Sequence, residues 1–147
     1  MDSTAEYPQS EEIERVPSLR IGFLGSGAGF LRVKLEDPMG QYGTFSAYDL
    51  SYPDFKQRIK QLQEANQNIR VVITDRILSN DAKWLNRQGI AIIFLDQTHR
   101  DHSYLTSEDP NRKVKNEVIT VKSIDAESMA TLLPKVAQAI ENLTQPK

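Results

Sequence analysis

The chain has 147 residues, of which 39% are hydrophobic and 26% are charged, and it contains no cysteine. A chain of this length and composition suits one domain with a buried core, and it excludes a disulfide framework, a thiolate nucleophile and a cysteine-ligated zinc site. The formal net charge of −2 gives no general attraction to nucleic acid, and no apolar run approaches the roughly 18 residues of a membrane span.

Residues 1–18 are predicted to be a flexible acidic tail before a single domain over residues 19–147. The segment carries five acidic side chains, one arginine and two prolines, and it shows no apolar periodicity. Such a polar, acidic start is not a signal peptide, so we expect a cytoplasmic protein with no membrane contact.

The ordered part is predicted to begin with a strand over residues 19–24. The glycine-rich run 25–29 follows it as a loop or tight turn. Residues 30–39 remain open between two structures, because their apolar side chains fit both the alternation of a strand and one face of a helix. Pro38 and Gly40 end the segment in either case.

A second strand is predicted over residues 43–50. Ser51 then resembles a helix cap, and Pro53 suits the first turn of that helix. The helix is predicted from one apolar stripe at i, i+4 and i+7, formed by Phe55, Ile59 and Leu62. The polar run 66–68 ends it.

Two further strands are predicted from uninterrupted apolar runs, residues 69–74 and residues 90–95, of the kind found in buried parallel strands. Between them we expect a helix that is capped by Ser79 or Asn80 and stops at Gly89.

The last third of the chain is predicted to contain a long polar loop, a strand and a helix. The loop covers residues 99–116, a length that indicates a functional or mobile segment. The strand covers residues 117–121. Ser123 or Asp125 caps the final helix, and Pro134 inside its apolar pattern either kinks it or delays its start.

Strands that alternate with helices predict an α/β fold, a doubly wound parallel sheet of about five strands covered on both faces. In such folds the ligand crevice lies at the carboxyl ends of the strands. We therefore expect function among the residues that end the predicted strands, which are Gly25-Ser26-Gly27, Asp75-Arg76, Asp96-Gln97-Thr98 and Lys122-Ser123.

This set of strand ends resembles the receiver domain of bacterial response regulators. Asp75 ends the third strand, Thr98 follows the fourth and Lys122 ends the fifth, and the run from Val121 to Met129 is similar to the end of a receiver. The resemblance covers residues 19–144. It implies a receiver or flavodoxin-like three-layer sandwich in which Asp75 accepts a phosphoryl group and Thr98 and Lys122 bind its oxygens.

The sequence departs from the receiver pattern where a receiver holds Mg²⁺. Receivers carry an acidic pair after the first strand, whereas this chain has Leu24-Gly25-Ser26-Gly27 there. Of the carboxylates that would hold Mg²⁺ in a receiver, Asp75 alone has a counterpart here. Lys122 also lacks the proline that usually follows it. The resemblance therefore implies a pseudo-receiver: a regulatory module that acts in signalling through protein–protein interaction.

For such a pseudo-receiver we expect no catalytic residue, and no cofactor unless a functional Asp75 pocket takes Mg²⁺. We expect an unidentified protein partner or a second copy of the chain to contact the last strand and helix, with the 99–116 loop nearby. A chain that ends at Lys147 leaves no room for an output domain, so we expect a stand-alone adaptor or a fragment.

The alternative is a small nucleotide- or phosphate-binding protein, hydrolytic or not, that uses Gly25, Ser26, Gly27 and Gly29. Backbone N–H groups of a glycine loop at a helix N-terminus bind phosphate, although a plain glycine turn has the same composition. Phe30 departs from the dinucleotide fingerprint, and only Asp49 stands near the place of its acidic ribose partner. A helix that opens at Ala28 would support phosphate binding, whereas a β-hairpin there would argue against both hypotheses.

Two polar clusters fall in the 99–116 loop. His99-Arg100-Asp101-His102, with Asp96 before it, has side chains that ligate metals, and His99 is a candidate base. No helical spacing fixes a third ligand in this hydrophilic segment, which favours a solvated loop. The basic cluster of Arg112, Lys113 and Lys115 is a solvated surface or a contact for a phosphate or a partner.

Overall fold

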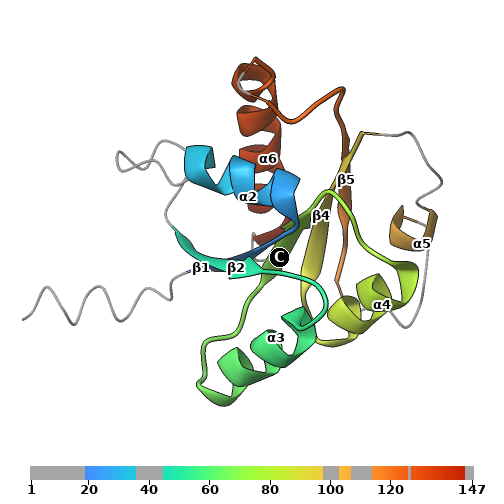
Figure 1. The fold of residues 1–147 in the computed structure, drawn as a ribbon. Helices are drawn as coiled ribbons and strands as arrows, with labels where there is room; N and C mark the ends of the chain where they lie inside the picture. The colour runs from blue at the N-terminus through green and yellow to red at the C-terminus, as the bar shows by residue number, and fades with distance from the viewer. Residues whose placement is uncertain (1–18, 36–44, 98–102, 107–113, 126, 145–147) are drawn as a thin grey trace, which may run out of the picture.

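A computed structural model describes residues 19–35, 45–97, 103–106, 114–125 and 127–144. Within these residues, strands and helices alternate along the chain (Figure 1). The elements are β1 (Leu19–Leu24), α2 (Ser26–Leu35), β2 (Phe45–Leu50), α3 (Phe55–Glu64), β3 (Val71–Thr74), α4 (Ser79–Arg87), β4 (Ala91–Asp96), α5 (Ser103–Thr106), β5 (Glu117–Thr120) and α6 (Met129–Thr144). The predicted tail, residues 1–18, lies outside the described residues, as do Pro38, Gly40 and Gly43.

The strands form one parallel sheet in the order β2-β1-β3-β4-β5. This confirms the predicted doubly wound α/β sheet and gives it the flavodoxin-like order. Leu24 at the end of β1 is in register with Leu50 of β2 and Thr74 of β3, so three strands end at one level. The order reverses between β1 and β3, and ligands of such sheets bind outside the carboxyl ends of the strands at this point.

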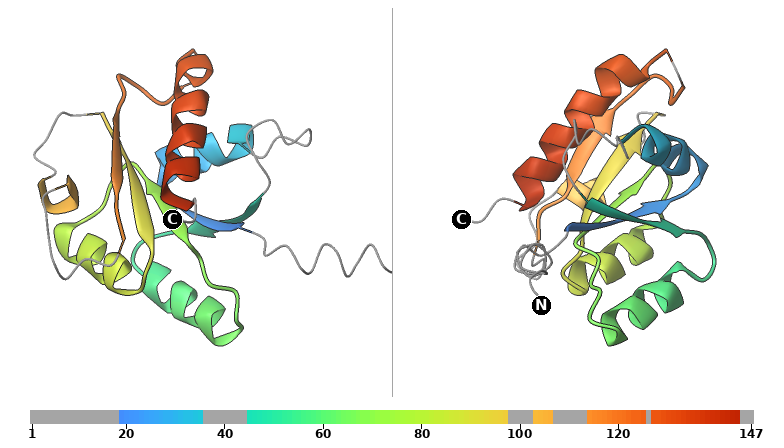
Figure 2. Two further views of the ribbon diagram at one scale, coloured as in Figure 1. Left: turned by 180° about the vertical axis from the view of Figure 1, so that it is seen from behind. Right: turned by 90° about the vertical axis from the view of Figure 1, so that its left-hand side faces the viewer.

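Helices cover both faces of the sheet (Figures 1 and 2). Alternate residues of a strand point to opposite faces, so Ile73 of β3 packs in the core under α2 and α6, whereas Val72 packs in the core that α3 and α4 cover. Both side chains are fully buried. Of the helices in the described ranges, none is long and apolar enough to cross a membrane.

Residues 30–35, for which the sequence left strand and helix open, belong to helix α2, which covers residues 26–35. Residues 36–39 lie outside the described residues. Ala28, Leu31 and Leu35 face the core and are fully buried, at a spacing of three and four residues. Phe30 and Val33 lie on the outer side, with exposed fractions of 38% and 68%.

The predicted caps of two helices are wrong. Ser51 does not cap α3, because a turn with a cis Tyr52–Pro53 peptide follows it and the helix begins only after Asp54. Helix α4 begins at Ser79 itself, after Leu78 in an extended conformation, so neither Ser79 nor Asn80 is its cap. The predicted end of α4 is confirmed by Gly89, which has a φ of +82°.

The predicted cap of α6 is wrong, because the helix begins at Met129, directly after Ser128, and neither Ser123 nor Asp125 is its cap. Asp125 instead holds the turn before the helix. Its carboxylate accepts hydrogen bonds from the Ser128 backbone N–H at 2.9 Å and from the Ser123 hydroxyl at 2.8 Å. These bonds, that of Ser128 first, lower the pKa of Asp125. Helix α6 begins five residues before Pro134, so the predicted delayed start is wrong.

The predicted 99–116 loop is not irregular throughout, because residues 103–106 form helix α5. Its Leu105 is fully buried in the core with α3 and α4. His99, Arg100, Asp101, His102, Arg112 and Lys113 lie outside the described residues, and Lys115 is exposed.

Candidate functional site

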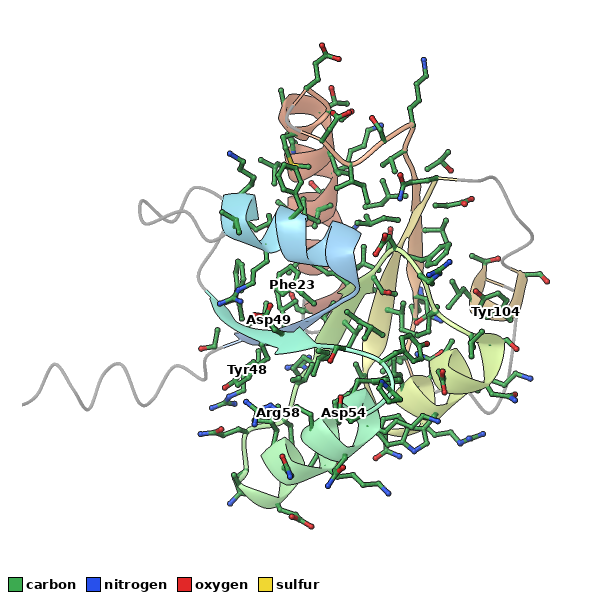
Figure 3. All side chains as sticks on the ribbon, in the orientation of Figure 1. Phe23, Tyr48, Asp49, Asp54, Arg58 and Tyr104 are labelled. Carbon is green, nitrogen blue, oxygen red and sulfur yellow. The ribbon has the colours of Figure 1, made fainter. Side chains whose placement is uncertain are left out.

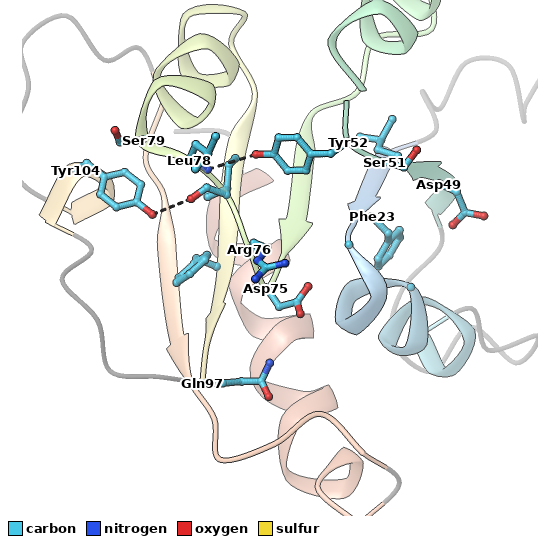
Figure 4. A pocket seen from close by; sticks show the side chains of 15 residues that line it. Phe23, Asp49, Ser51, Tyr52, Asp75, Arg76, Leu78, Ser79, Gln97 and Tyr104 are labelled. Carbon is cyan, nitrogen blue, oxygen red and sulfur yellow. Dashed lines mark hydrogen bonds between the residues drawn. The ribbon is translucent and has the colours of Figure 1, made fainter. Parts of the chain in front are cut away.

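A cleft of about 880 Å³ lies at the carboxyl ends of the strands, at the point where the strand order reverses (Figure 4). Such a volume falls within the range of about 300–1,000 Å³ that is typical of small-molecule sites. Its polar side chains are Asp49, Ser51, Asp75, Arg76, Ser79 and Gln97, and Gly25 and Gly29 contribute backbone. Its apolar and aromatic side chains are Phe23, Leu50, Tyr52, Ile77, Leu78, Phe94 and Tyr104.

One wall of the cleft is aromatic and aliphatic, and the segment after β3 holds it together. The Tyr104 hydroxyl donates to the Ile77 carbonyl oxygen at 3.3 Å, and the Leu78 N–H donates to the Tyr52 hydroxyl oxygen at 3.3 Å. Leu78 is 66% exposed and Tyr52 is 39% exposed, so this wall presents uncovered apolar surface.

Tyr52 is fixed at the rim by a charged pair on two helices. Its hydroxyl donates to Asp81 Oδ2 at 2.9 Å, while Asp81 Oδ1 lies 2.8 Å from the Lys56 ammonium. Burial, and to a smaller extent the Asp81 carboxylate, raise the pKa of Tyr52 to about 12, against the opposing effect of the Leu78 N–H. Tyr52 therefore stays a neutral hydrogen-bond donor at physiological pH.

Asp75 lies against the first turn of α2. A Cβ atom on Gly25 would stand 2.7 Å from Asp75 Oδ1, and one on Gly27 would stand 2.5 Å from Asp75 Oδ2. Gly25 also has a φ of +100°, a conformation that other residues rarely adopt. The predicted loop over residues 25–29 is wrong beyond Gly25, because residues 26–29 begin helix α2. The close approach of a carboxylate explains the glycines at positions 25 and 27.

The Asp75 carboxylate is incompletely satisfied by the protein. Its Oδ1 is buried and has no hydrogen-bond partner in the part of the chain that the structure describes. The positive end of the α2 dipole favours a negative charge at this place, although a buried oxygen without a donor still costs free energy.

Of the residues predicted for a receiver pocket, the structure describes Asp75 and Lys122. Asp75 lines the cleft, whereas Lys122 is exposed and lines a separate cavity beside β5 and α6. Among the described residues, no ion pair joins the Lys122 ammonium to Asp75 or Asp96. Asp96 is buried at the end of β4, and Thr98 lies outside the described residues.

The described acidic side chains near the cleft are spread over separate places. Asp49, the loose candidate for a ribose partner, lines the cleft but pairs with Arg32 of α2. No group of three or more histidines and acidic residues gathers within the described ranges. Mg²⁺ takes oxygen ligands in a near-octahedral arrangement. At the α2 turn, Asp75 beside Gly25 and Gly27 is a single carboxylate ligand.

A second hollow runs along β5 and α6. It consists of two adjoining cavities of about 410 and 400 Å³, both of which Thr120 and Lys135 line. In the described part of the sheet β5 pairs with β4 alone, so its outer edge is an unpaired strand edge.

Tyr52 and Tyr104 are among the lining residues that the sequence analysis missed. Tyr52 stands in a Tyr-Pro dipeptide, which signals a turn but not a cleft. Tyr104 reaches the cleft from a short helix in a polar segment, and no local pattern reveals it.

Comparison with known proteins found no matching family model, no matching curated protein and no matching solved structure.

Proposed function

We propose that this chain is a receiver-like regulatory module that acts in signalling through protein contact and does not undergo aspartyl phosphorylation. One observation carries the proposal. The sheet has the order β2-β1-β3-β4-β5, and Asp75 after β3 faces Gly25 and Gly27, where a receiver has its acidic pair.

The surroundings of Asp75 support a module without phosphoryl transfer. That reaction needs a metal ion that bridges the phosphoryl oxygens and neutralises the developing charge. Within the described residues no group of three or more histidines and acidic side chains gathers around Asp75, and Lys122 lines another cavity. In this proposal the module keeps one acidic residue of a receiver's site, Asp75.

The face formed by β5 and α6 supports contact with a partner. The two adjoining cavities combine apolar side chains such as Ile119 and Leu132 with charged ones such as Glu117 and Lys135. The unpaired edge of β5 offers backbone groups to an extended segment of a partner. A mixed, hollowed surface beside a free strand edge suits regulated and reversible association.

An NMR titration with Mg²⁺, then with Mg²⁺ plus beryllofluoride, tests the absence of phosphorylation. Beryllofluoride mimics an aspartyl phosphate, and we expect no saturable shift of the Gly25, Gly27 and Asp75 amides. Saturable shifts at these amides that the Asp75→Asn variant abolishes would instead establish a working phosphoacceptor and overturn this part of the proposal.

Site-specific photo-crosslinking in the source cells tests the partner face. A photoreactive residue at Thr120 should give a discrete adduct, whereas the same residue at Lys60, exposed on α3, should give none. An adduct of twice the chain mass identifies a homodimer, and a different mass identifies another protein. Equal yields at both positions, or no adduct at Thr120, would remove the face from the proposal.

A second candidate function, the binding of a nucleotide or another phosphate, is favoured by the start of α2 at Ser26 directly after Gly25. The Asp75 carboxylate opposes it, because the carboxylate lies where the helix would attract a phosphate. Titration with inorganic pyrophosphate separates the two functions: saturable shifts of Gly27 and Gly29, strengthened by Asp75→Asn, would favour the second.

A further inference from the structure

The cleft at the strand ends carries two adjacent opposite charges that the described protein does not neutralise. Asp75 Oδ1 is buried without a partner, and the Arg76 guanidinium has no ion pair or hydrogen bond with any described side chain. Both residues line the cleft, and Figure 4 shows them at its centre. A ligand that neutralises both must carry a cationic donor and an anionic acceptor close together.

The rest of the ligand must match the apolar wall. Tyr52, Leu78 and Tyr104 line the cleft beside the two charges, and Leu78 is 66% exposed. An exposed leucine between two tyrosines buries apolar area only when something covers it. The cleft therefore combines a dipolar centre with an apolar wall.

Other ligand chemistries fit the cleft less well. A phosphate would meet the Asp75 carboxylate at the α2 turn, and the described residues gather no group of three or more acidic or histidine side chains for a divalent cation. A purely apolar molecule would leave the charges of Asp75 and Arg76, which both line the cleft, without a counter-charge. An ammonium group offers the Asp75 carboxylate a charged hydrogen-bond donor.

We propose that the cleft binds a zwitterionic amphipathic small molecule of the class of α-amino acids with a large apolar or aromatic side chain. The ammonium group pairs with Asp75, the carboxylate pairs with Arg76, and the side chain lies against Tyr52, Leu78 and Tyr104. This inference goes beyond the proposed function, since it adds a ligand to which the regulatory module responds.

Calorimetric titration of the full chain with L-phenylalanine tests the proposal. Two analogues each carry one of the two charged groups of L-phenylalanine. Phenethylamine has the ammonium group alone, and 3-phenylpropionate has the carboxylate alone. We expect Asp75→Asn to lower the affinity for L-phenylalanine and for phenethylamine on the order of tenfold. The affinity for 3-phenylpropionate should not change. Arg76→Gln should lower the affinity for L-phenylalanine and for 3-phenylpropionate by a similar factor. The affinity for phenethylamine should not change.

Asp54→Asn and Arg58→Gln serve as matched controls, because both residues are exposed at the start of α3 and neither lines the cleft (Figure 3). They should leave every affinity unchanged. Amide shifts should map to Tyr52, Asp75 and Leu78. If L-phenylalanine does not bind, if both charge variants bind it normally, or if the shifts map to β5 and α6, the proposal is overturned.

Arg76 is exposed, so its variant keeps the test decisive even if Asp75→Asn fails to fold. Crosslinking at Thr120 needs no ligand, so failure of the ligand proposal is distinguishable from failure of the partner proposal.

Discussion

At the scale of single residues, the contact between Asp75 and the α2 turn explains which glycines are required. A Cβ on Gly27 would lie 2.5 Å from Asp75 Oδ2 and 2.9 Å from Ile124 Cδ1, whereas a Cβ on Gly29 would meet nothing within 4 Å. Two glycines of one helix therefore differ in role although the sequence presents them alike.

Alanine substitution should separate these two glycines. We expect Gly27→Ala to lower the free energy of unfolding by about 1–3 kcal/mol, because Asp75 and Ile124 must move. Gly29→Ala should raise it by about 0.5–1 kcal/mol, since alanine loses less conformational freedom in a helix. Urea denaturation measures both. A neutral Gly27→Ala would show that Asp75 does not lie against the turn.

Tyr52 predicts a pH dependence at the alkaline end. Because folding raises the pKa of Tyr52 from 10.0 to about 12, the neutral phenol is favoured in the folded state. Its contribution to stability is complete below pH 10 and is lost as the pH rises through about 12. We expect the free energy of unfolding to fall over this interval, and less steeply in Tyr52→Phe.

Phenolate absorbance checks the same group directly. The difference between the wild-type titration and that of Tyr52→Phe isolates one of the five tyrosines. A midpoint near 10 in this difference would contradict the arrangement of Tyr52 with Asp81.

At the scale of elements, Asn116 joins α4, β4 and α5. Its amide group donates to Asn86 Oδ1 at 3.0 Å and to the Leu105 carbonyl oxygen at 3.1 Å. Its Oδ1 accepts from the Ile92 N–H at 3.0 Å and from Asn86 Nδ2 at 2.9 Å. Four hydrogen bonds thus anchor the end of the segment that the sequence marks only as a polar loop.

Asn116→Ala should lower the free energy of unfolding by about 2–4 kcal/mol, because the Asn86 side chain and the Ile92 N–H lose partners in a largely buried place. Asn68→Ala, at an exposed position after α3, is the matched control and should change it by less than about 0.5 kcal/mol. Equal effects in thermal denaturation would refute the anchoring role.

The sequence predicts an element well when residues close together in the chain determine it. The strands were predicted because apolar runs such as 69–74 are local, and the structure has β3 over Val71–Thr74. The caps at Ser51 and Ser79 were wrong because the Tyr52–Pro53 turn and the Leu78–Tyr52 hydrogen bond set the starts of those helices. Such contacts leave no local pattern.

At the scale of the whole molecule, the candidate site was predicted in part. The doubly wound sheet places function at the strand ends, and Gly25, Asp75, Arg76 and Gln97 indeed line the cleft. The aromatic wall could not be predicted, because Tyr104 reaches it from another segment through a bond to the Ile77 carbonyl oxygen. The separation of Lys122 from the cleft likewise depends on tertiary structure.

The two cores share one sheet, so they should unfold together. Trp84, the sole tryptophan, packs against the core of α3 and α4 and reports on that face. Val136 of α6 is fully buried in the opposite core, and Val136→Ala should cost about 2 kcal/mol. Since β3 contributes Val72 to one core and Ile73 to the other, loss of packing on either face weakens both.

We therefore expect Val136→Ala to lower the urea midpoint of Trp84 fluorescence as much as that of far-ultraviolet circular dichroism. Val33→Ala is the matched control, because Val33 is 68% exposed on α2 and should leave both midpoints in place. A Trp84 transition that stays fixed while the circular dichroism midpoint falls would mean that the two layers unfold separately. The cleft would then lie between independent units, whereas a shared transition makes ligand binding at the strand ends a stabiliser of the entire sheet.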